Sequence, residues 1–104
     1  MGDTKSARDQ YEAIKSAARI FQSPPGLYRI IRLNDPTCPF HLEVNRNNED
    51  KGDEIFKIRI TTMPPTQDEI QRCRDFILPK KIFTKFILEK EPNKKDSFIF
   101  HEIQ

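Results

Sequence analysis

The chain has 104 residues, of which 18 are Lys or Arg and 16 are Asp or Glu, so its formal net charge is +2. This near balance excludes the broad positive surface of a dedicated nucleic-acid-binding domain, and the length predicts one domain, residues 1–104, with one hydrophobic core. Two cysteines, a polar start after Met1 and apolar runs of only three residues predict an intracellular protein with reduced thiols and no membrane span.

The first predicted element is a helix over residues 5–22. Its apolar or small side chains recur at the spacing of one helix face, namely at Ala7, Tyr11, Ile14, Ala18 and Phe21. Ser6 and Asp9 resemble a helix-starting cap. The two prolines of SPPG (23–26) cannot continue a helical hydrogen-bond ladder, so we expect the helix to stop there.

Three strands are predicted next, at 27–33, 40–44 and 54–62. They are rich in branched and aromatic residues and are separated by the turn sequences NDPTCP and NRNNEDKGD, which favours an antiparallel meander. Apolar residues alternate with polar ones, as at Phe40, Leu42 and Val44. Alternation of this kind predicts one buried face and one solvated face.

A second helix is predicted within residues 63–79. Thr66 and Glu69 form a T-x-x-E capping box, and Asp68 and Glu69 suit the positive end of the helix dipole. The residues Ile70, Cys73 and Ile77 then share one helix face.

Residues 80–91 allow two interpretations. The i,i+4 pairs Ile82–Phe86 and Phe83–Ile87 favour a helix, whereas the Ile, Phe and Thr content and the turn sequence PNKKD favour a hairpin with a strand at 97–103. With the hairpin preferred, the predicted fold is an α+β domain of order α-β-β-β-α-β-β. Its antiparallel sheet of four to five strands packs against two helices.

The order of helix, three strands, proline-rich corner and helix resembles two families of small domains. Double-stranded-RNA-binding domains share it, but their basic cluster at the start of the second helix falls here on the acidic TQDEI (66–70). RWD-type interaction domains also share it, with TTMPPT (61–66) as a loose counterpart of their proline corner. The resemblance implies an α+β fold and carries no functional residue over.

Reactive chemistry is sparse in this sequence. Cys38 and His41 could begin a zinc site or pair a nucleophile with a base, yet strand alternation places them on opposite faces. The helical position of Cys73 points it inward, and no phosphate-binding loop or catalytic motif is present. We therefore predict no catalytic residues, no metal, no cofactor and no enzymatic activity.

A lysine-rich segment offers one binding hypothesis. Its cations lie near Phe83 and Phe86, and together they could contact phosphates while the rings stack on bases of an RNA. The alternative is a solvated, lysine-protected edge with the phenylalanines in the core. The residues of this candidate nucleic-acid patch are Lys80, Lys81, Lys85, Lys94 and Lys95.

Surplus apolar residues in the C-terminal strands support the leading hypothesis, a non-catalytic protein-interaction module or small subunit of an intracellular complex. Phe98 and Phe100 face one way, and a second set faces the other. If that second sheet face is open, it presents an apolar strip to a protein partner; alternatively, a helix covers it. The predicted partner-binding strip comprises Phe83, Ile87, Ile99 and Ile103.

Overall fold

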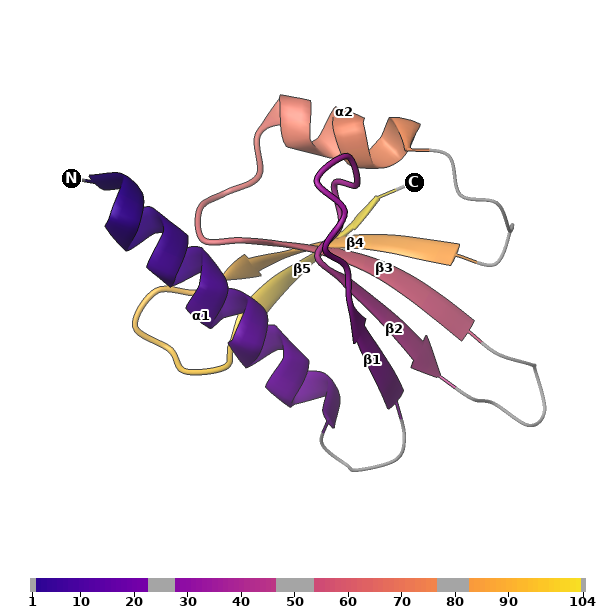
Figure 1. Cartoon of the computed structure of the whole chain (residues 1–104), viewed down its shortest axis with the longest axis horizontal. Coiled ribbons are helices and arrows are strands. Elements are labelled where there is room, and N and C mark those ends of the chain that lie inside the picture. The colour runs from indigo at the N-terminus through magenta and orange to yellow at the C-terminus, as the bar shows by residue number, and fades with distance from the viewer. Residues whose placement is uncertain (1, 23–27, 47–53, 77–82, 104) are drawn as a thin grey trace.

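Seven elements follow one another in the computed structural model, which describes residues 2–22, 28–46, 54–76 and 83–103 (Figure 1). The order α-β-β-β-α-β-β and the α+β class are confirmed. The predicted stop at SPPG and the residues Ile77, Lys80, Lys81 and Ile82 lie outside the described residues. The elements are α1 (Gly2–Gln22), β1 (Tyr28–Arg32), β2 (Leu42–Arg46), β3 (Glu54–Thr61), α2 (Gln67–Asp75), β4 (Phe83–Lys90) and β5 (Phe98–Ile103).

The five strands form one sheet in the order β1-β2-β3-β4-β5. The antiparallel meander β1–β2–β3 is confirmed, and the hairpin interpretation is correct for residues 83–90, which pair antiparallel with β5. One pairing differs from the predicted antiparallel sheet, because β3 and β4 run parallel. The chain passes through α2 between these two strands and returns to the end of the sheet where β3 begins, so the sheet is mixed.

Helix α1 covers one face of the sheet. Phe40, predicted to share this face with Leu42 and Val44, precedes β2 and packs instead in the apolar cluster on the α2 side. Leu42, Val44 and Ile58 are fully buried on this face, as the alternation within β2 and β3 predicts. Ala13 and Ala17 of α1 pack against them, and their small side chains let the helix approach closely. Each buried branched side chain contributes roughly 1.5–3 kcal/mol through removal from water.

Helix α2 lies on the opposite side of the sheet (Figure 1). The predicted capping box is confirmed, since the Thr66 hydroxyl accepts a hydrogen bond from the Glu69 amide and the Glu69 carboxylate accepts one from the Thr66 amide. Cys73, fully buried, packs with Phe40, Ile87 and Ile103 in a second apolar cluster. The second face is therefore covered by α2 at this end, and the two helices flank the sheet on opposite sides.

Ion pairs tie α2 and the polar residues of this second face together. The Arg59 Nε donates to Glu69 of α2 at 3.0 Å, and its Nη1 donates to the Pro39 carbonyl at 2.8 Å. Lys57 pairs with Glu43 across β3 and β2 at 2.5 Å. Of these two ion pairs, Arg59–Glu69 joins α2 to the sheet, whereas Lys57–Glu43 joins two neighbouring strands.

Candidate functional site

The two edges of the sheet differ in how open they are to another strand. β1 carries the exposed cations Arg29 and Arg32, and charges of this kind discourage edge-to-edge pairing. β5 pairs with β4 alone among the described strands, and its sequence FIFHEI contains no Lys, Arg or Pro. Ile99 is 44% exposed and Phe100 is 51% exposed, on opposite faces of this strand. β5 is thus the last strand at its side of the sheet (Figure 1), and Glu102 is the exposed acidic residue on a strand whose other exposed side chains are apolar.

The backbone hydrogen bonds of β5 show which of its groups face outward. The Glu91 amide donates to the Ser97 carbonyl at 3.0 Å, so these two residues form a hydrogen-bonded pair. Such pairs alternate along an antiparallel ladder, and the register then directs the backbone groups of Ile99 and His101 toward β4. The N–H and C=O groups that point away from the sheet belong to Phe98, Phe100 and Glu102.

An aromatic hollow of about 180 Å³ lies beside Phe100 on the α1 face. The Phe100 ring stands edge-on to Phe86 at a centroid distance of 6.1 Å and to Phe21 of α1 at 6.4 Å. These contacts hold the half-exposed ring in place next to the open edge. The hollow is lined by Phe21, Tyr28, Phe56, Ile58, Phe86 and Phe100.

The predicted partner-binding strip is divided by this fold. Ile87 is fully buried and Ile103 is 8% exposed, because α2 covers both. Nothing is described of the Phe83 side chain, although its backbone begins β4. Among the three members of the set whose side chains the structure describes, only Ile99 is exposed, and Phe100, which the sequence assigned to the other face, is exposed beside it. Sequence reasoning missed Phe100 because it considered only one face of the sheet. A strand at the edge of a sheet can expose side chains on both faces, and this signal could have found Phe100.

The candidate nucleic-acid residues do not converge within the described part of the chain. Lys85 lies near the start of β4, where its Nζ donates to the carbonyls of Arg74 and Phe76 at 2.9 and 2.8 Å. Lys94 and Lys95 lie beyond the other end of β4, and Lys94 pairs with Glu91 at 3.1 Å. Lys80 and Lys81 lie outside the described residues. Through its hydrogen bonds to the Arg74 and Phe76 carbonyls, Lys85 serves as a cap for the C-terminal end of α2.

Replacing Lys85 with methionine is expected to lower the free energy of unfolding by about 1 kcal/mol, because it removes a cation from the last carbonyls of α2. Urea denaturation followed by circular dichroism measures this. Lys94→Met is the matched control, since an exposed i,i+3 ion pair contributes only about 0–0.5 kcal/mol. Equal urea midpoints for the two variants would show that Lys85 has no capping role.

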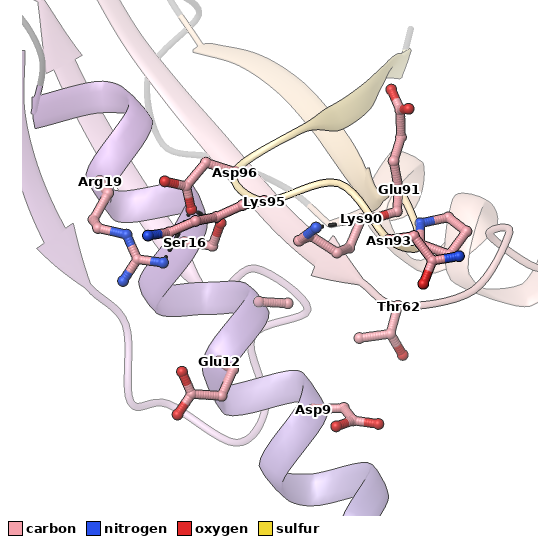
Figure 2. A pocket seen from close by; sticks show the side chains of 12 residues that line it. Asp9, Glu12, Ser16, Arg19, Thr62, Lys90, Glu91, Asn93, Lys95 and Asp96 are labelled. Atoms are coloured by element: carbon pink, nitrogen blue, oxygen red, sulfur yellow. Dashed lines mark hydrogen bonds and ion pairs between the residues drawn. The ribbon is translucent and has the colours of Figure 1, made fainter.

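A polar groove of about 350 Å³ lies between α1 and the β4–β5 hairpin (Figure 2). Asp9 and Glu12 line its helical side, and Lys90 and Lys95 line its hairpin side. Asp96 accepts hydrogen bonds from Ser16 and, at 3.0 Å, from Arg19 Nη2. The hydrogen bond from Arg19 is the main cause that lowers the pKa of the Asp96 carboxyl.

This Asp96 contact explains what the groove does in the fold. Asp96 has φ of 56° and Asn93 has φ of 63°, so the hairpin turns through the left-handed region at both residues. The Asp96 carboxylate, held by Ser16 and Arg19, joins this turn to α1. The groove's described polar groups thus fasten the hairpin, and with it the start of β5, onto the helix.

Cys38 and His41 lie in a structural turn. Thr37 N–H donates to Asp35 Oδ1 at 2.9 Å, and Cys38 packs at the border of the α2-side cluster. His41 Nδ1 accepts a hydrogen bond from the Ile60 N–H at 2.9 Å, so the imidazole ring satisfies a backbone amide of β3. Burial, with a smaller contribution from Arg59, lowers the pKa of His41 to about 4. Burial also raises the pKa of the Cys73 thiol.

The described side chains include no group of three or more His, Cys, Asp or Glu that could hold a metal ion. Neither described helix is both long and apolar enough to cross a membrane. Comparison of the chain with protein-family models, curated proteins and solved structures found no match.

Proposed function

We propose that this chain is a non-catalytic protein-interaction module, or a small subunit of an intracellular complex, that receives a strand from its partner at the outer edge of β5. The observation that carries the proposal is the open edge itself, where Ile99 and Phe100 are exposed on the two faces of one terminal strand that has no lysine, arginine or proline. An edge of this kind is a template for a further strand.

Strand addition assigns separate roles to the backbone and the side chains. The outward N–H and C=O groups of Phe98, Phe100 and Glu102 bind any extended polypeptide, and each hydrogen bond contributes a net 0.5–1.5 kcal/mol, roughly. Ile99 and Phe100 then contact alternate side chains of the incoming strand on its two faces. The aromatic hollow beside Phe100 favours a strand that places an apolar side chain there.

A library of extended peptides displayed on phage tests the proposal directly. We expect selection on the wild-type protein to enrich peptides with alternating branched or aromatic residues. Binding of these peptides should fall at least tenfold, roughly, in Glu102→Pro, because proline removes an outward amide donor and its ring blocks the edge. The β4 pairing uses the neighbouring residues His101 and Ile103, so the sheet itself is retained.

Glu102→Ala is the matched control, since it keeps the outward amide and removes only an exposed carboxylate. It should bind the selected peptides within about twofold of wild type. If no peptide is enriched, or if Glu102→Pro binds as well as Glu102→Ala, the edge of β5 is not the binding surface.

A further inference from the structure

We infer that a second copy of this chain can occupy the outer edge of β5, so that two sheets join through antiparallel β5–β5 pairing about a two-fold axis at Phe100. This inference rests on the proposed function and names the partner strand. Its basis is self-complementarity: the shape, the backbone groups and the charges of β5 match those of the same strand turned around.

The backbone permits only certain registers. Residues whose groups point outward must face residues of the same kind, so Phe98, Phe100 and Glu102 pair only among themselves. A two-fold axis at Phe100 sets Phe100 opposite Phe100 and sets Phe98 opposite Glu102 of the second copy. All the outward groups of these residues are then satisfied, and each sheet face continues as the same face in the second copy.

This register also buries the exposed apolar side chains. The two Phe100 rings meet on the α1 face, and Ile99 meets His101 of the second copy on the α2 face. A register shifted to place His101 on the axis would set Phe100 against a Glu102 carboxylate. A register centred on Ile99 would pair Phe98 with Phe100, but it would set the Glu102 carboxylate against Asp96 of the turn. Of these three registers, only the one centred on Phe100 pairs all three outward-facing residues of β5 with one another.

Opposite charges meet in the same register. Lys90 is the β4 neighbour of Phe98, and its Nζ lies 5.7 Å from the centroid of the Phe98 ring. Glu102 of the second copy faces Phe98 and so approaches that ammonium group. The two-fold axis forms this contact twice, and within Phe98–Ile103 no like charges lie opposite each other in this register.

The neighbouring elements leave room for the second strand. Helix α2 contacts the Ile103 end of β5, whereas the hairpin turn lies at the Phe98 end. Antiparallel pairing puts α2 of one copy beside the turn of the other rather than beside the other α2. One pair of short strands buries less than a standard interface of roughly 1,200–2,000 Å², so we expect a weak, concentration-dependent dimer.

Sedimentation velocity of the purified wild-type chain, without any other protein, is the first measurement. We expect the monomer at about 1 μM to shift toward a dimer at about 1 mM. Glu102→Lys, which sets a lysine against Lys90 of the second copy, should weaken dimerisation by about tenfold. A chain that stays monomeric at the higher concentration overturns the inference.

Cysteine cross-linking tests the register in reducing-agent-free buffer. Directly opposite residues of a hydrogen-bonded pair have Cα atoms about 5.5 Å apart, which suits a disulfide. Phe100→Cys should therefore oxidise to a covalent dimer at least tenfold faster, roughly, than Ile99→Cys, whose two copies lie off the axis. Equal rates, or faster oxidation of Ile99→Cys, overturn the register and the inference with it. Loss of the dimer with retained peptide binding would leave the proposed function standing, because that function is measured separately.

Discussion

Truncation of Ile87 to alanine is expected to lower the free energy of unfolding by about 2–4 kcal/mol. Ile87 is fully buried between the sheet and α2, where it packs with Cys73 and Phe40. The truncation removes apolar contacts and leaves a cavity that the surrounding side chains fill only in part. Urea denaturation at low protein concentration measures the change. The expected loss is large, because the whole free energy of unfolding of a protein domain is only about 5–15 kcal/mol.

Ile99→Ala is the matched control for Ile87→Ala. Both isoleucines lie on the same sheet face and in paired strands, but Ile99 is 44% exposed on the open edge. Its truncation should change the stability of the monomer by no more than about 0.5 kcal/mol. Similar losses for the two variants would contradict the placement of α2 over Ile87.

The second large effect is a loss of stability in mild acid caused by His41. Its folded-state pKa of about 4 lies below the ordinary value of 6.5, because burial and Arg59 disfavour the charged ring. Well above pH 6.5 the ring is neutral in both the folded and the unfolded state, and its contribution to stability is complete. As the pH falls from 6.5 to 4, the unfolded chain binds a proton that the folded chain does not, so stability declines by on the order of 2 kcal/mol.

His41→Asn isolates this effect. The asparagine Oδ1 occupies nearly the place of the imidazole Nδ1 and can accept the Ile60 N–H, but it does not titrate. The free energy of unfolding of wild type minus that of His41→Asn should fall between pH 6.5 and 4 and change little above that range. A difference that is constant with pH would show that His41 does not titrate as its environment requires.

The interaction hypothesis arose from surplus apolar residues in the C-terminal strands, and the structure changes which residues carry it. The alternation of FIFHEI correctly placed Ile99 and Ile103 on one face and Phe100 on the other. Burial does not follow alternation here, since α2 covers Ile103 and leaves Ile99 in the open. The candidate surface therefore consists of neighbours along an edge strand rather than residues that share a face.

Local patterns by themselves determined the helices, the meander and the alternation within each strand. The capping box at Thr66 and the buried set around Leu42 and Val44 depend on residues close in sequence, so their physical causes are visible there. Only the tertiary structure decided that residues 83–90 are a strand parallel to β3, that α2 covers Ile87, and that β5 ends the sheet. These features depend on which distant segments lie side by side, and a pattern of hydrophobicity records only that a side chain must be buried, not what buries it.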